Sequence, residues 1–316
     1  MDLTVASLLT QVEELWFSDG TLVIQAGTKL FRVAGGILAA RSSVFKDMLA
    51  IPQPPYHTTV DGCPIVFLHD SPEDFECFLR AIFDSSFFER PPARTTALIV
   101  TAILRLSTKY DIGYLRQRAL LHLASASPLS LDGFRALSYT STFSNTHLFS
   151  LLMTADSLGL EWAKVVPMFG ISCFVDPEDI LSGVDMVPGQ PKLLLSPSLQ
   201  RTCIRARTEL VAVQMRDTFS FIYILPVATC ESPAECRSER DALRRVFTAY
   251  KCVNPFLQLH PTSWDELDLC VACLDAAKVE FDAALRRVWE QFPGIFGLGS
   301  WEQLRGAKES DLAGSK

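Results

Sequence analysis

Cysteine is the residue type whose spacing in this sequence most clearly suggests chemistry. The chain has nine cysteines, and four of them form two pairs in its last third. Cys230 and Cys236 have five residues between them, and Cys270 and Cys273 form a C-x-x-C pair. The C-x-x-C spacing places two sulfurs on one side of a turn, which suits a tetrahedral all-thiolate zinc site. These four residues are therefore candidate ligands of one structural zinc.

Two observations keep other interpretations of the cysteines open. The spacing of the first pair is wider than that of a usual zinc knuckle, and Cys252 or His260 could replace Cys236 as a ligand. Reduced cysteines are also often plain core residues. A closed four-thiolate site would hold its module together without implying catalysis, because it offers no open coordination position with a general base.

Other chemistry-bearing residues form no recognisable motif. The five histidines are scattered, and no serine or cysteine nucleophile stands in a known pattern with them. Gly35-Gly36 lacks the downstream Gly-Lys-Ser/Thr of a phosphate-binding loop. We therefore predict no catalytic residue, no bound cofactor other than zinc, and no enzyme activity. The histidines are His57, His69, His122, His147 and His260.

Composition indicates a folded protein that is not a general nucleic-acid binder. With 316 residues, of which 48% are hydrophobic and 21% charged, the chain can bury a core in more than one domain. Its formal net charge is -7 and its pI about 5.3. Affinity for the phosphate backbone comes from clustered Lys and Arg, so we do not expect nucleic acid as a partner.

The longest apolar run predicts a buried strand and not a membrane span. This run, Phe219 to Val227, is about half of the roughly 18 residues that a membrane helix needs. Met1 to Leu15 contains Glu13 and Glu14 and no basic region, so we expect no signal peptide and a location in the cytoplasm or nucleus. Cysteines in these compartments are mostly reduced.

The N-terminal third predicts a hairpin followed by helices. Thr21–Gln25 and Leu30–Val33 are short apolar strands joined by a Gly27 turn. Helical spacing follows, with hydroxyls at Ser42 and Ser43 to cap a helix. Further predicted elements are a strand at 64–68, a helix begun by Ser71 with Pro72 at its first position, and helices at 96–110 and 112–124.

The sequence motifs within this pattern resemble those of a known family. The run D-G-x-x-x-x-x-A-G-x-x-L-F-R-V-x-x-x-I-L-A-A-R-S-x-V-F-K-D-M-L, from Asp19 to Leu49, resembles the BTB/POZ domain in the form common in mushroom-forming fungi. The resemblance covers about residues 14–125. The ending W-x-x-F-P-x-I-F-G-L-x-x-W-E-x-L, with a C-x-x-C before its helix, also resembles the tails of these fungal proteins. One departure is Ala34-Gly35-Gly36, where most members carry His-Lys or His-Arg, which removes a charge from a groove that some members use for peptide partners.

We therefore expect an α+β protein in five parts. Residues 1–13 are an N-terminal extension, predicted as a short helix that either swaps across a dimer or packs locally. Residues 14–126 are a BTB/POZ-like domain, a short β-sheet flanked by helices. Residues 127–195 are a helical extension that ends in a proline-rich linker at 177–198, at the start of which Asp176 to Leu181 can form one capped turn. Residues 196–306 are a small α/β cysteine-bearing module, and residues 307–316 a disordered tail.

Two helices are expected in the C-terminal module. One covers 196–217, and its arginines predict a solvated face. The other covers 269–292 and should stop at Pro293-Gly294. The arginines are Arg201, Arg205, Arg207 and Arg216.

The resemblance implies a non-enzymatic protein-interaction role, in which the BTB part forms a homodimer or docks a scaffold. One use is a substrate adaptor of a cullin-type ubiquitin ligase, and the other a dimeric nuclear or transcriptional regulator or scaffold. An alternative from a different class is an enzyme that uses a cysteine or a metal in the C-terminal third.

Overall fold

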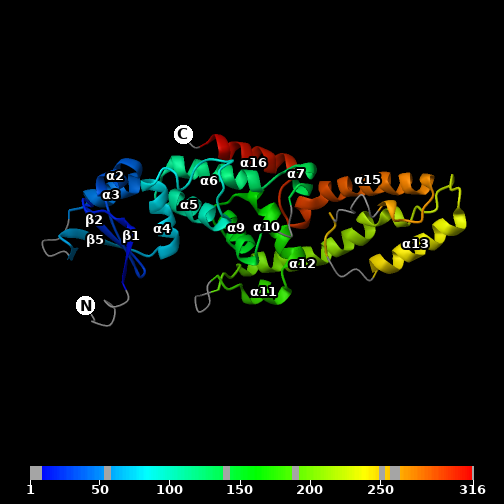
Figure 1. The fold of residues 1–316 in the computed structure, drawn as a ribbon, viewed down its shortest axis with the longest axis horizontal. Helices are drawn as coiled ribbons and strands as arrows, with labels where there is room; N and C mark the ends of the chain where they lie inside the picture. Colours follow the sequence, from blue (N-terminus) through cyan, green and yellow to red (C-terminus); the bar gives the residue numbers. More distant parts are fainter. Residues whose placement is uncertain are drawn as a thin grey trace. The chain divides into compact units, whose positions relative to one another are not determined.

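The chain has mixed α+β structure and folds as two compact units (Figure 1). This computed structural model describes residues 9–52, 58–137, 143–186, 192–248, 253–256 and 264–314. Unit 1 comprises residues 1–126 together with 309–316, and unit 2 comprises residues 127–308. Residues 127–195 and 196–306, which we expected as separate segments, thus belong to one unit.

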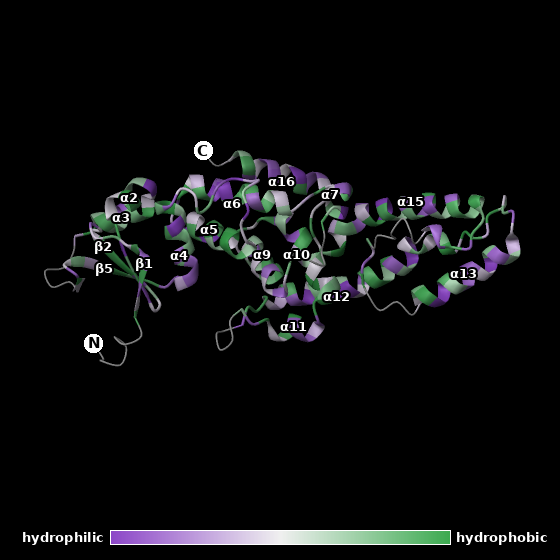
Figure 2. Cartoon of the chain, viewed as in Figure 1, coloured by the Kyte–Doolittle hydropathy of each residue, from purple (hydrophilic) through white to green (hydrophobic). Residues whose placement is uncertain are grey.

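Unit 1 contains a five-stranded sheet in the order β1-β3-β2-β5-β4. Strands β2 (Leu22–Ala26) and β3 (Lys29–Val33) form the predicted antiparallel hairpin, and Gly27 supplies the positive φ of +54° that its turn needs. Strand β5 (Cys63–Leu68) runs parallel to β2, and β4 (Thr59–Val60) pairs with β5. Figure 2 shows β2 and β5 as mainly hydrophobic, in keeping with their place inside the sheet.

The helices of unit 1 follow the predicted order. They are α2 (Gly35–Arg41), α3 (Ser43–Ala50), α4 (Pro72–Phe83), α5 (Ala97–Lys109) and α6 (Gly113–Ala126). Ser42 caps α3 by accepting a hydrogen bond from the Phe45 N–H, and Ser71 caps α4 in the same way through Asp74. Beneath these helices, Phe45 stacks on Tyr110 with ring centroids 4.6 Å apart.

Unit 2 is built from helices around an aromatic core. The Phe134 ring lies within 5.5 Å of the rings of Phe169, Phe256 and Phe292. Its longer elements are α9 (Asn145–Ser157), α10 (Glu161–Phe174), α12 (Pro197–Val213), α13 (Pro233–Thr248), α15 (Val271–Ile295) and the first part of α16 (Trp301–Ala313), which from Glu309 on belongs to unit 1. The shorter ones are α7 (Leu131–Arg135), α11 (Pro177–Ser182), a π turn η1 (Gln214–Thr218) and a 3-10 turn η2 (Ser220–Ile222).

The predicted strand at 219–225 is wrong. Residues Ser220–Ile222 form the 3-10 turn η2, and Leu225-Pro226 is a cis peptide bond. Phe219, Phe221, Ile222 and Leu225 are buried while Tyr223 and Ile224 are exposed, a pattern without the alternation of a strand. The described part of 196–306 contains no strand, so the C-terminal module is helical and not α/β.

Both ends of the chain also differ from the prediction. The first described residues form a strand, β1 (Thr10–Trp16), parallel to β3, where we expected a helix. Its Val12 and Leu15 are buried. At the other end, the expected disordered tail is the last part of helix α16, which continues to Ala313.

Three smaller findings concern prolines and one arginine. Helix α11, capped by Asp176, confirms the capped turn allowed at the start of the predicted linker at 177–198, and a bridge between Val184 and Leu193 adds structure that was not predicted there. Helix α15 was predicted to stop at Pro293-Gly294, but it includes Pro293 and ends at Ile295. Arg207 is not on a solvated face, because its guanidinium donates hydrogen bonds to backbone carbonyls at the end of α10.

Candidate metal centre

The four paired cysteines come together in unit 2. Their sulfur atoms all lie within 4.8 Å of one another, and the Sγ atoms of Cys230 and Cys270 are 3.7 Å apart. A zinc ion with Zn–S bonds of about 2.3 Å holds its sulfurs about 3.8 Å apart in a tetrahedron. The set therefore fits one tetrahedral metal ion with a small inward shift of the side chains, and the four residues could bind a metal.

Two helix starts and one turn position the sulfurs. Cys230 closes a turn by donating its backbone N–H to the Val227 carbonyl, and Cys236 lies on the first turn of α13, bonded to the Ser232 carbonyl. Cys270 is the N-cap residue of α15, and Cys273 lies on the first turn of that helix. The C-x-x-C spacing thus places both of its sulfurs at one helix end, as the sequence predicted.

The N-terminal ends of α13 and α15 provide positive electrostatic potential at the sulfurs. Unpaired N–H groups and the helix dipole make a helix N-terminus favourable for negative charge. The Cys270 N–H donates to the Cys236 sulfur at 3.3 Å. Four thiolates around one divalent cation would carry a net charge of about minus two, and these donors would offset part of it.

In the metal-free cluster, local contacts lower the pKa of one thiol and raise the pKa of two others. Hydrogen bonds from the backbone N–H groups of Glu231 and Cys273 lower the pKa of Cys270 to about 6. Burial raises the pKa of Cys273 to about 12, and burial also raises the pKa of Cys236. A metal would have to displace protons from the two buried thiols.

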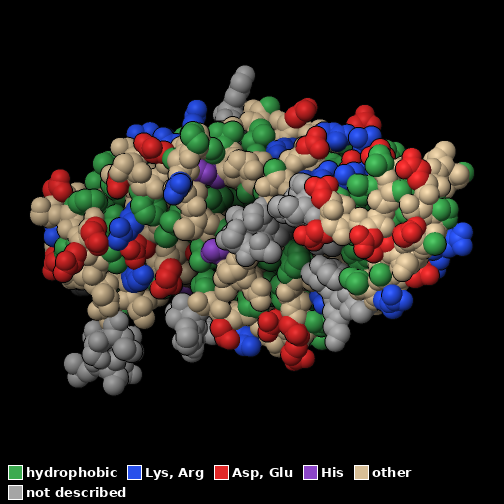
Figure 3. All heavy atoms as spheres, turned by 45° about the vertical axis from the view of Figure 1, so that its right-hand side comes forward, with side chains coloured by type: hydrophobic (Ala, Val, Ile, Leu, Met, Phe, Trp, Pro, Cys, Tyr) green, Lys and Arg blue, Asp and Glu red, His purple; other side chains and the backbone are tan. Residues whose placement is uncertain are grey.

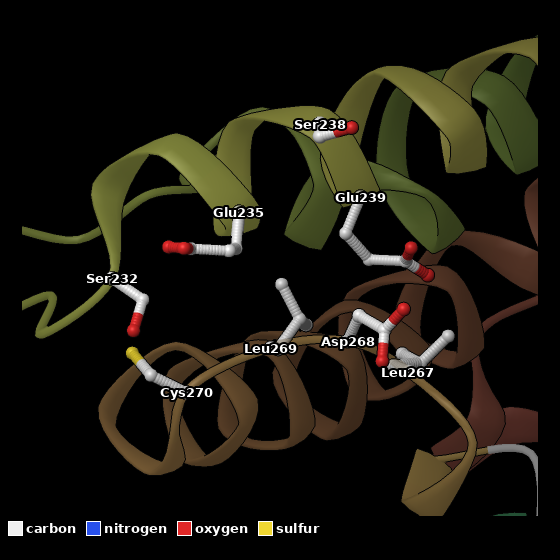
Figure 4. Close-up of a pocket in the computed structure, with 8 residues that line it drawn as sticks. All are labelled: Ser232, Glu235, Ser238, Glu239, Leu267, Asp268, Leu269 and Cys270. Carbon is white, nitrogen blue, oxygen red and sulfur yellow. The ribbon is translucent and has the colours of Figure 1, made fainter.

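An open hollow of about 510 Å³ lies beside the cluster, between the start of α13 and the segment before α15. Figure 4 shows Glu239 from α13 facing Asp268 across it. Glu235, from the same helix, points toward the other end of the hollow, where the Cys270 sulfur is directed toward Ser232. Burial and the nearby Asp268 charge raise the pKa of Glu239. The hollow gives solvent a route to Cys270.

Sequence reasoning found the four cysteines and missed the acidic side of the hollow. Glu235 and Glu239 stand four residues apart, which places them on one face of α13, and this spacing could have been noticed. Asp268 joins them from a distant segment, and no local pattern indicates that. Cys252 and His260, the alternative ligands, lie outside the described residues.

The remaining described cysteines belong to the packing of the protein. Cys63, Cys173 and Cys203 are buried, and Cys77 is half-buried. The Cys63 thiol donates to the Gly20 carbonyl, and burial raises the pKa of Cys203 to about 12. Within the described ranges, the paired cysteines are the group of metal-ligating side chains that the structure brings together.

No family model, curated protein or solved structure matches this chain. In the ranges that the structure describes, no helix is both long and apolar enough to cross a membrane. On the face shown in Figure 3, Lys and Arg side chains are interspersed with Asp and Glu.

Proposed function

We propose that Cys230, Cys236, Cys270 and Cys273 bind one structural zinc ion. The observation that carries this proposal is the approach of four sulfurs to nearly the separation that tetrahedral zinc imposes. The metal would join the starts of α13 and α15, two helices that begin 38 positions apart at Pro233 and Val271. It would thereby close the loop between them in the folded state.

Native mass spectrometry of the full chain, with and without a chelator, tests the zinc proposal. We expect one zinc per chain, lost on chelation. A Cys77→Ser variant serves as the matched control, because Cys77 lies on α4 in unit 1 and its loss should leave the zinc content unchanged. If the protein is metal-free after expression with ample zinc, the zinc proposal is wrong and the four cysteines are only packing residues.

We further propose that the protein is a non-enzymatic interaction protein whose unit 1 is a BTB/POZ-like domain. Support comes from the order of its elements. A β2–β3 hairpin feeds two short helices, α2 and α3, and is followed by β5 and α4, as the resemblance of residues 14–125 implies. The all-thiolate donor set supports the non-enzymatic part, because a closed site leaves no coordination position for a substrate.

The partners under this proposal are proteins. The BTB-like unit would form a homodimer or dock a scaffold, in the cytoplasm or nucleus, and a cullin-type scaffold is the first candidate. Light scattering of the purified chain tests self-association, and a binding measurement with a purified cullin tests the adaptor role. A monomer without cullin affinity would contradict both uses of this unit.

An enzyme in the C-terminal third makes the opposite prediction from a structural site. If the cluster is structural, Cys270→Ser should lower zinc content and stability together, and no activity should be lost separately from folding. A Cys270→Ser variant that stays folded, keeps its metal and loses a measurable activity would favour the enzyme.

A further inference from the structure

The four sulfurs of the cluster differ in their access to solvent. Cys236 and Cys273 are fully buried, each 0% exposed, whereas Cys230 and Cys270 are half-buried. Cys270 also lines the open hollow of Figure 4. Cys230 and Cys270 are therefore partly open to solvent, and Cys236 and Cys273 are closed off from it.

The sulfurs of the two half-buried cysteines are also neighbours. Their Sγ atoms lie 3.7 Å apart, although Cys230 and Cys270 are separated by 40 positions in the sequence. A disulfide needs sulfurs at about 2.05 Å, so modest rotation of the two side chains would bring them together. The cluster thus contains an accessible dithiol next to an inaccessible one.

We propose that Cys230 and Cys270 are an oxidation site, at which a hydroperoxide joins them in a disulfide and so releases the zinc. Only the release of zinc rests on the zinc site proposed above. The pairing of Cys230 with Cys270 follows from the positions of the sulfurs, whether or not a metal is bound.

The chemistry requires one hydroperoxide for each disulfide. The Cys270 thiolate attacks the O–O bond of hydrogen peroxide, which gives a sulfenic acid on Cys270 and a hydroxide that takes up a proton. The Cys230 thiolate then attacks the Cys270 sulfur, the S–S bond forms, and a second hydroxide leaves and is protonated. Two thiolates, one peroxide and two protons become one disulfide and two waters. With Cys230 and Cys270 joined, only Cys236 and Cys273 would remain as thiolate ligands, too few to hold a zinc ion.

The hollow explains why Cys270 reacts first. Its rim holds polar side chains, Ser232 and Glu235 among them, and its opening admits a small oxidant as far as the Cys270 sulfur. Cys230 then stands as the resolving thiol beside it. Cys236 and Cys273 are shielded from the oxidant by the surrounding side chains.

The test treats the full-length zinc-loaded protein with increasing hydrogen peroxide. A chromophoric chelator records zinc release, free thiols are alkylated, and peptide mass spectrometry without reductant maps the bridges. We expect Cys230–Cys270 to be the dominant bridge and zinc release to rise in step with it, one ion per bridge. The Cys77→Ser control should respond as the parent protein does.

A second variant gives an independent readout of the order of events. In Cys230→Ser, the sulfenic acid on Cys270 loses its nearest partner, so dimedone should label Cys270 more strongly than in the parent protein. Equal labelling of the two proteins would overturn the assignment of Cys270 as the attacking thiol and Cys230 as the resolving one. The bridge mapping uses the parent protein, so it holds even if this variant folds poorly.

The outcomes separate this inference from the zinc proposal. Protein without zinc before oxidation contradicts the zinc site, and the bridge mapping of the metal-free chain then decides the pairing by itself. A dominant Cys236–Cys273 bridge, a statistical mixture of bridges, or thiols that survive excess peroxide would overturn the oxidation site. Zinc that stays bound after the Cys230–Cys270 bridge has formed would overturn the release.

Discussion

Cys270 and Cys273 are separated by one turn of backbone, but their environments favour opposite protonation states. Cys270 receives backbone hydrogen bonds that favour its thiolate, and Cys273 is buried, which favours its thiol. In the metal-free protein at neutral pH, the cluster should therefore hold a thiolate at its solvent-facing side and thiols at its buried side.

This difference predicts site-selective alkylation of chelator-treated protein. The pKa of Cys270 is about 6, so its reaction with iodoacetamide should be near its maximum at pH 8 and should slow as the pH falls through about 6, where the thiolate is protonated. Cys273, with a pKa of about 12, should react slowly throughout this range. Peptide mass spectrometry at each pH measures both rates, and equal rates for the two cysteines would contradict the prediction.

Ser42 illustrates how one hydroxyl can link two segments of unit 1. It accepts from the Phe45 N–H at 3.0 Å and donates to the carbonyl of Tyr110, 68 positions away. The side chain is 2% exposed, so water cannot replace these bonds. We expect Ser42→Ala to lower the free energy of unfolding by about 1–3 kcal/mol.

Urea unfolding measures this loss. Ser43→Ala is the matched control, because the adjacent hydroxyl bonds to Asp111 at an exposed position, and its removal should cost no more than about 0.5 kcal/mol. If both variants unfold alike, the buried pair of hydrogen bonds is not what holds α3 in place.

At the level of elements, the end of α10 depends on a residue from α12. Arg207 donates to the carbonyls of Ser172, Cys173 and Val175, at 2.9, 3.4 and 3.3 Å. A cation at a helix C-terminus is also favoured by the helix dipole. This single side chain therefore serves as the C-terminal cap of α10 and ties it to α12.

Arg207→Met should destabilise unit 2 while keeping most of the packing of the side-chain stem. We expect a loss of about 1–3 kcal/mol in the free energy of unfolding, because three buried carbonyls lose a charged donor. Arg201→Met, an exposed position on the same helix, should change it by about 0.5 kcal/mol or less. Chemical denaturation of both variants provides the comparison, and equal stabilities would contradict the capping role.

The elements that sequence reasoning predicted best are those with a local physical signal. Ser71 followed by Pro72 sets the start of α4, and the turn at Gly27 sets the hairpin. Helix α16 also carries such a signal: Ser300 and Gln303 form a capping box, in which each side chain bonds the backbone N–H of the other residue. The polar composition of residues 307–316 led instead to the prediction of a disordered tail.

The failed strand and the cluster show what local signals cannot provide. An apolar run such as 219–225 suits a strand or a buried turn equally well until a partner strand is known, and the described residues of unit 2 supply none. The cysteine spacing predicted the set of ligands. It could not predict that two of these cysteines would be half-buried and two fully buried, because that depends on how α13 and α15 meet.

At the level of the whole molecule, the two units should respond differently to loss of metal. The proposed zinc site lies in unit 2, and its removal should loosen the starts of α13 and α15, because binding energy at such a site contributes directly to folding. Strands β2 and β3 and helix α5 belong to unit 1 and should stay protected.

Hydrogen exchange with and without a chelator measures this difference by segment. We expect faster exchange at residues 230–240 and 268–276 and unchanged exchange at 22–33 and 97–109. Uniform acceleration across both units would show that the metal supports the fold as a whole, and no acceleration would show that the cluster stabilises nothing.

The membership of residues 309–316 in unit 1 also has a consequence for the order of folding. The Gln117 side-chain amide donates to the carbonyl of Leu312 at 2.9 Å, so the surface of α6 is completed by a segment nearly 200 positions later in the chain. On the ribosome, unit 1 would emerge first and yet wait until all of unit 2 has been synthesised before its last contacts form. A fragment cut at residue 126 would keep the sheet and lose this closing segment.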